Sequence, residues 1–130
     1  LNRIPKDKQH HAAVLRSRIR VLLHLKKWKQ AEKLAIKGLR LYPEENEFMV
    51  QRAFALHQQE KGDQAVQVIL DAPEWIRRTG ILHYNLACYE CVLGNMEAAK
   101  AYLETSVSMD SRFREYAKDD PDLKPLYATE

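Results

Sequence analysis

The feature that most constrains this chain is its match to itself at a fixed spacing. Alanine stands at positions 31, 65 and 99, and we call the interval between successive alanines the repeat period. Three further columns hold small or apolar residues at the same spacing: Ile19, Ala53 and Ala87; Ala35, Ile69 and Leu103; Gly38, Ala72 and Ser106. A fixed period of this length is typical of a chain built from stacked copies of one small unit. We expect three units, at residues 12–45, 46–79 and 80–113.

Each unit contains two stretches in which apolar residues recur every three or four positions, which predicts two α-helices. Small residues let two antiparallel helices approach closely, while larger apolar residues fill the spaces between them. Lys26-Lys27 and Gly94-Asn95 are the expected turns of the first and third units. In the second unit Pro73 should end the second helix early. We expect residues 72–79 to be irregular there, with Trp75 and Ile76 folded back as a plug.

The pattern resembles the tetratricopeptide repeat, over roughly residues 12–113. The matching stretches are 84–87 (Tyr-Asn-Leu-Ala), Gly94-Asn95, Ala98-Ala99 and Tyr42-Pro43, the last standing where the family often has a proline between repeats. The resemblance implies an all-α fold, a right-handed α-solenoid of three antiparallel helix pairs. It also implies that the first helices of the pairs line a groove for a peptide or helix.

The residues after the repeats are expected to close the end of the solenoid, because its last apolar face needs a cover. Ser111 is expected to cap a helix through Lys118, and Asp122 to Tyr127 one further short helical turn. The cap therefore spans 111–127, and residues 1–130 form one domain. The expected anchors are Leu123, Leu126 and Tyr127. The alternative is that the last ten residues are unstructured.

If the resemblance holds, the groove runs from a basic end to an apolar and aromatic end. An extended peptide or helix with an acidic part and a few large apolar side chains would suit it. In the alternative reading, Val50, Phe54 and Tyr84 pack beneath the cap instead of binding a partner. The predicted partner-binding groove consists of Arg16, Arg20, Leu23, His24, Val50, Phe54, His57, Gln58, Tyr84, Cys88 and Cys91.

Charge is divided unevenly along the chain. Residues 1–40 carry twelve Lys or Arg against two Asp or Glu, a net charge of +10, and residues 41–130 carry nine against sixteen, a net charge of −7. Such a division bears on partners and not on fold. A basic patch is predicted around the first turn, and it is read either as a solvated face or as a site for an acidic protein surface. Nucleic acid is less favoured, since Trp28 is the one nearby aromatic residue able to stack on a base. The patch consists of Lys26, Lys27, Lys29 and Lys33.

The residue patterns of common catalytic and metal sites are missing from the sequence. There is no glycine-rich phosphate loop, no nucleophile elbow and no histidine pair at metal-ligand spacing. Cys88 and Cys91 fall in the middle of a predicted helix, with no second pair to complete a zinc site. They are expected to pack or to line the groove. We therefore predict no catalytic residue, no cofactor and no metal.

The leading functional hypothesis is an adaptor or scaffold that binds a protein or peptide through the groove and the basic end. A kinesin-light-chain-like adaptor that binds an acidic, tubulin-like filament is one form of it, motivated by charge. The alternatives are a nucleic-acid-binding helical repeat and a regulatory domain of a larger protein. No apolar run approaches the roughly 18 residues of a membrane span, and residues 1–8 do not resemble a signal peptide. A cytoplasmic protein that does not enter the membrane is expected.

Overall fold

The computed structural model describes residues 6–77 and 79–128, and every regular element in them is helical. This confirms the all-α prediction. The elements are α1 (Lys6–His24), α2 (Trp28–Leu41), α3 (Asn46–Gln58), α4 (Gly62–Leu70), α5 (Glu74–Arg77), α6 (Gly80–Val92), α7 (Met96–Met109), α8 (Arg112–Asp119), the 3₁₀ turn η1 (Pro121–Leu123) and α9 (Lys124–Ala128).

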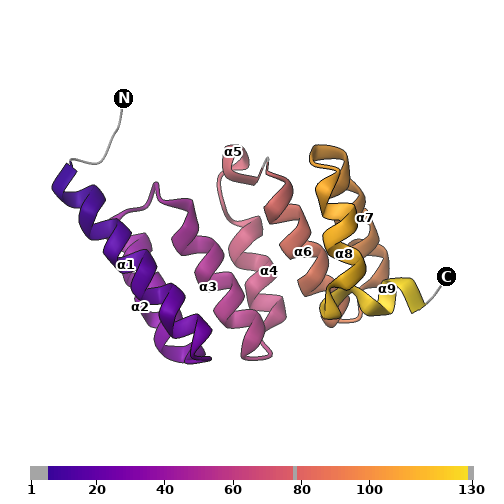
Figure 1. Cartoon of the computed structure of the whole chain (residues 1–130), viewed down its shortest axis with the longest axis horizontal. Helices are drawn as coiled ribbons and strands as arrows, with labels where there is room; N and C mark the ends of the chain where they lie inside the picture. Colours follow the sequence, from indigo (N-terminus) through magenta and orange to yellow (C-terminus); the bar gives the residue numbers. More distant parts are fainter. Residues whose placement is uncertain (1–5, 78, 129–130) are drawn as a thin grey trace.

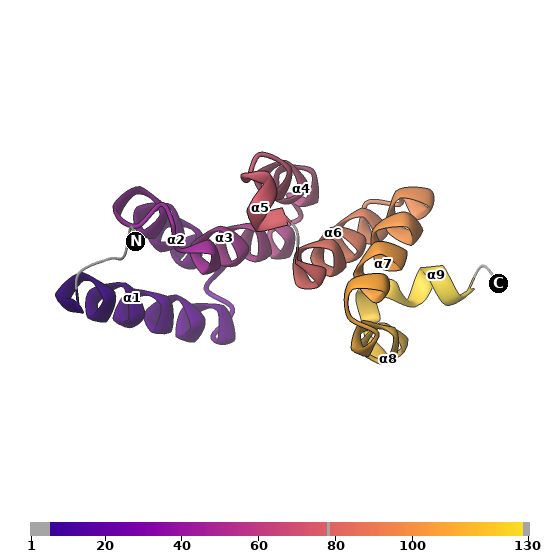
Figure 2. The same cartoon turned by 90° about the horizontal axis from the view of Figure 1, so that it is seen from above.

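Consecutive helices pack as pairs, α1 with α2, α3 with α4 and α6 with α7, and each pair packs on the next. The helices α1, α3 and α6 run in one direction and α2, α4 and α7 run in the opposite direction (Figure 1). Seen from above, the row curves, with α4 and α5 on one side and α1 and α8 at its two ends on the other (Figure 2). We call α1, α3 and α6 the inner helices and α2, α4 and α7 the outer helices.

The repeat columns lie where the helices touch. The alanines of the outer helices, Ala31, Ala65 and Ala99, have no exposed surface. The column from the inner helices, Ile19, Ala53 and Ala87, is equally buried. In the column of Gly38, Ala72 and Ser106, the Ser106 hydroxyl donates a 2.9 Å hydrogen bond to the carbonyl oxygen of Gly80. The helices therefore meet at the positions that the repeat predicts.

The three turns inside the pairs share one backbone geometry. Each has a residue with positive φ: Lys26 at 61°, Glu60 at 63° and Gly94 at 90°. In the first turn the Lys26 N–H donates to the Leu23 carbonyl, and the Lys27 N–H donates to the Leu22 carbonyl. The same two bonds recur one and two repeat periods later, at the second and third turns. This is the Schellman helix ending, in which glycine is the residue of lowest steric cost at the positive-φ position.

Replacing Lys26 or Glu60 with glycine should therefore stabilise the fold. We expect Lys26→Gly and Glu60→Gly each to raise the free energy of unfolding by about 0.5–1 kcal/mol, because glycine has no Cβ to clash at positive φ. The matched controls are Lys27→Gly and Lys61→Gly, at neighbours whose φ is −90° and −113°. These should be neutral or destabilising in urea unfolding followed by circular dichroism. If the control variants gained as much free energy of unfolding as Lys26→Gly and Glu60→Gly, the assignment of positive φ to Lys26 and Glu60 would be contradicted.

Gly38 is required for a different reason, the close approach of α2 and α3. A Cβ at Gly38 would lie 2.5 Å from a ring carbon of Phe48, a fully buried side chain. The Phe48 ring also stacks on Tyr42, with centroids 6.2 Å apart, so it has little room to move. The glycine is therefore kept for packing, against the helix propensity that favours alanine.

Gly38→Ala should lower the free energy of unfolding by about 1–3 kcal/mol, because overpacking outweighs the gain of about 1 kcal/mol from helix propensity. The control is Lys37→Ala, at the exposed neighbouring position of α2, which should change stability by less than about 0.5 kcal/mol. Thermal or urea unfolding measures both. A stabilised Gly38→Ala variant would mean that Phe48 does not hold the position seen here.

The segment between the second and third pairs is more regular than predicted. As expected with Pro73 ahead, α4 is short and ends at Leu70, but residues 74–77 form the helical turn α5 instead of an irregular stretch. The predicted plug of Trp75 and Ile76 lies outside the described side chains.

The cap forms, with two differences from the prediction. Residues 112–119 and 121–128 are helical, so the prediction of a structured tail is confirmed for these residues. Ser111 makes no side-chain capping bond, and the Asp110 carboxylate accepts from the Arg112 N–H instead, at 3.0 Å. Leu123 and Leu126 are buried as expected, but Tyr127 is 39% exposed and is not an anchor. Helix α8 packs on α7 and ends before Pro121. Pro121 occupies the repeat position that Ala87 occupies in the third unit.

Candidate functional site

The predicted basic end of the groove is engaged in ion pairs within the chain. Arg16 lies 2.9 Å from Glu45 and 3.8 Å from Glu47. The Arg20 guanidinium donates two hydrogen bonds to the Glu47 carboxylate, at 2.5 and 2.7 Å. These contacts hold α1 against the start of α3. Arg16 and Arg20 therefore contribute less free positive charge to the inner side than the sequence suggested.

The α6 residues of the predicted groove lie under the cap. The Tyr84 hydroxyl of α6 donates a 2.7 Å hydrogen bond to Asp120 Oδ2, and the Cys88 thiol lies 3.6 Å from the same oxygen. Asp120 Oδ1 accepts from the Asp122 N–H at 3.0 Å, so both oxygens of Asp120 are occupied. The Tyr84 ring also stacks on Phe113 of α8, with centroids 5.2 Å apart. We call the contact of Tyr84 and Cys88 with Asp120 the cap lock.

His57 extends the cap lock to α3. Its Nε2 atom lies 3.1 Å from Asp122 Oδ2, and its ring packs against Tyr89 with centroids 4.6 Å apart. The side chain is 8% exposed. The cap is thus held by α3 and α6 together, and His57 is a structural contact here instead of an open groove residue.

The two cysteines are shielded thiols. Burial is the main cause that raises the pKa of Cys88, and the neighbouring carboxylates of Asp120 and Asp122 raise it further. Burial likewise raises the pKa of Cys91, whose side chain is almost fully covered. A reactive cysteine needs a lowered pKa and access to solvent. Both side chains are therefore packed inside the protein, which is one of the two roles that the sequence predicted for them.

Cys88, Asp120 and Asp122 are also the group best placed to hold a metal ion among the described residues. Their thiol and carboxylate ligand atoms all lie within 4.8 Å of one another. However, the hydrogen bonds from Tyr84 and from the Asp122 backbone already satisfy Asp120. The arrangement is explained by cap docking, and it does not require an ion.

Removing the Tyr84 hydroxyl should loosen the cap. We expect Tyr84→Phe to lower the free energy of unfolding by about 1–2 kcal/mol, because a hydrogen bond to a carboxylate is lost while the ring contact stays. It should also speed the labelling of Cys88 by a thiol reagent, measured in a Cys91→Ala background. Tyr116→Phe, at a tyrosine of α8 that is 54% exposed, is the control and should change neither quantity. Unchanged labelling in Tyr84→Phe would contradict the cap lock.

The part of the predicted site that remains open lies at the α1–α2 turn and the end of α3. Phe54 is 37% exposed, and its ring meets Trp28 edge to face with centroids 6.0 Å apart. Trp28 is half-buried and stands between the exposed residues Lys27 and Lys29. We name this surface the aromatic–lysine patch; it consists of Trp28, Phe54, Lys26, Lys27, Lys29 and Lys33.

The remaining predicted residues border this patch or lie further along the inner helices. On α1, His24 is exposed and Leu23 is half-buried. On α3, Gln58 is exposed and Val50 is half-buried. The structure thus divides the predicted groove into an open part on α1 and α3 and a covered part, which consists of the α6 residues and His57 of α3.

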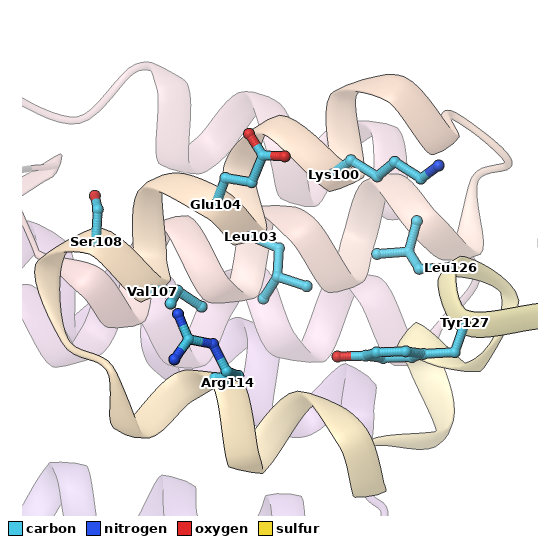
Figure 3. Close-up of a pocket in the computed structure, with 8 residues that line it drawn as sticks. All are labelled: Lys100, Leu103, Glu104, Val107, Ser108, Arg114, Leu126 and Tyr127. Atoms are coloured by element: carbon cyan, nitrogen blue, oxygen red, sulfur yellow. The ribbon is translucent and has the colours of Figure 1, made fainter. Parts of the chain in front are cut away.

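A cavity of about 640 Å³ lies at the other end of the molecule, between α7 and the cap (Figure 3). Its floor is apolar, from Leu103, Val107 and Leu126, and the Tyr127 hydroxyl points toward Arg114 across it. It occupies the side of α7 that a full fourth inner helix would cover if α8 did not stop at Asp119. The cavity is therefore a consequence of the short cap.

Sequence reasoning missed the acidic partners of the site. Glu45 and Glu47 neutralise the arginines of α1, and Asp120 and Asp122 fasten the cap. The grouping Asp-Asp-Pro-Asp at 119–122 was a usable signal, since an aspartate just before a proline often caps a turn. Trp28, half-buried beside Phe54, was not among the predicted partner-binding residues, but it belongs to the open patch.

Comparison with protein-family models, with curated protein sequences and with solved structures finds no match to this chain. Among residues 6–77 and 79–128, no helix has both the length and the apolar character of a membrane span.

Proposed function

We propose that this protein is a tetratricopeptide-type adaptor that binds an acidic peptide or helix of a protein partner at the aromatic–lysine patch. The observation that carries the proposal is the exposed Phe54 ring, set against Trp28 beside four exposed lysines. Large aromatic side chains dominate the affinity of protein interfaces, and nearby charge sets the choice of partner.

The tetratricopeptide arrangement is supported by recurrence along the chain. The positive-φ turn residues stand at 26, 60 and 94, and the buried alanines of the outer helices stand at 31, 65 and 99. Both sets keep the same repeat period with no drift. Three copies of one helix–turn–helix unit, stacked side by side, account for both sets.

The closed cap narrows the proposed binding surface. With Tyr84, Cys88 and His57 held against Asp120 and Asp122, the groove residues of α6 are not available to a ligand. The partner is therefore expected to contact α1, α3 and the turn between α1 and α2. The four lysines, rather than the paired arginines, supply the positive charge. A partner with one or two large apolar side chains and acidic neighbours fits this surface, and an acidic filament of tubulin-like character is one such partner.

The proposal can be tested with a random peptide library displayed on phage. We expect the selected peptides to combine acidic residues with a large apolar or aromatic residue. Their affinity, measured by fluorescence anisotropy, should fall at least about tenfold in Phe54→Ala and in Lys26→Glu/Lys29→Glu. The matched controls are Ile81→Ala, at another exposed apolar residue, and Lys124→Glu, at another exposed lysine. Both controls should retain the parent affinity.

Two outcomes would count against the adaptor. Peptide binding that is equal in the parent and in both patch variants would show that the patch is not the site. Binding of single-stranded RNA or DNA that falls steeply with salt, with no selected peptide, would favour the nucleic-acid alternative.

A further inference from the structure

The outward face of α1 carries a stripe of exposed apolar side chains outside the aromatic–lysine patch. Val14 is 41% exposed and Val21 is 56% exposed, and Leu25, just after the helix, is 56% exposed. Arg18 stands between the two valines and is also exposed. The spacing of four, three and four positions places all of them on one side of a helix. We call these four residues the α1 edge.

The repeat shows what covers this stripe elsewhere in the molecule. One repeat period after Val14 and Val21 stand Phe48 and Ala55 of α3, and both have no exposed surface. They lie in the cluster formed with Ala31 and Ala35 of the preceding outer helix, α2.

The same stripe is buried again in the third pair. Two repeat periods after Val14 and Val21 stand Leu82 and Tyr89 of α6, each 2% exposed. They belong to the cluster that contains Ala65 and Ile69 of the preceding outer helix, α4. In both later pairs, then, this stripe of the inner helix packs against the outer helix before it. On α1 no helix takes that place among residues 6–77 and 79–128.

Charge indicates which kind of helix would fit. Helix α1 contains five Lys or Arg residues and one acidic residue, Asp7. The ion pairs with α3 engage Arg16 and Arg20 but not Arg18, which belongs to the α1 edge. A second copy docked through the same face would bring like charges together, which disfavours self-association there. An acidic helix would bring complementary charge.

We propose that the α1 edge docks an acidic amphipathic helix of a protein partner, in the position that an outer helix takes in the later pairs. The partner helix would place apolar residues at every third or fourth position against Val14, Val21 and Leu25, with Asp or Glu beside Arg18. This surface is separate from the aromatic–lysine patch, so the proposal does not depend on the proposed function.

The test uses a synthetic lactam-bridged helix of about 18 residues, close to the length of α1, with leucine at every third or fourth position and glutamate elsewhere. We expect binding by fluorescence anisotropy to weaken at least about tenfold in Val14→Asp/Val21→Asp. The control Ile81→Asp, at an exposed position of α6, should bind like the parent. Binding should also weaken as salt is raised, because exposed charges are screened. A peptide with lysine in place of glutamate should bind at least about tenfold more weakly.

Nuclear magnetic resonance then locates the peptide on the full chain. Amide shifts centred on Val14, Val21 and Leu25 support the proposal. Shifts centred on Trp28 and Phe54 would overturn it while leaving the proposed function intact. Equal binding of the glutamate and lysine peptides would also overturn it. So would sedimentation showing a dimer of the parent that Val21→Asp dissociates, because the occupant would then be a second copy. Circular dichroism confirms that the variants remain folded.

Discussion

The close approach of neighbouring helices at small, fully buried residues is the constraint on which the rest of this structure depends. Each outer helix brings an alanine to the contact; the inner helices α3 and α6 bring Ala53 and Ala87, and α1 brings the larger, equally buried Ile19. Close packing leaves no room for larger groups there, as the contact of Gly38 with Phe48 illustrates. The helix directions, the shared turn geometry and the division into inner and outer faces all follow from keeping these contacts in register.

Much of the fold could be predicted from the sequence because its information is local and repeated. The small-residue positions and the turn residues recur at intervals of one repeat period. Each helix pair can therefore be recognised from its own residues. The misses are of another kind. Asp110 instead of Ser111 caps α8, a choice between two adjacent residues that share the chemistry of a helix cap. Residues 74–77 form a helical turn although Pro73 interrupts the regular pattern.

The candidate site was harder to predict because its decisive contacts join distant parts of the chain. Tyr84 meets Asp120 across 36 residues, and Arg20 meets Glu47 across 27. Periodicity shows that a residue faces inward, but it does not show which polar group lies opposite. The groove itself stays a prediction. Of the three residues that the alternative reading placed beneath the cap, Tyr84 lies there, whereas Phe54 is exposed and Val50 is half-buried. Which of the predicted groove residues are exposed and which are covered depends on where the C-terminal cap packs.

The break at Pro121 has a consequence for the length of the molecule. Helix α8 starts on α7 as a fourth inner helix would, and the chain leaves the helix at the position where α3 and α6 carry alanine. From there η1 turns back onto α6. Pro121 thus acts as a stop in a modular series. Duplication of a helix pair on the N-terminal side of Pro121 can lengthen the row. A helix pair added on its C-terminal side could not stack on α8, because the chain has already turned back onto α6.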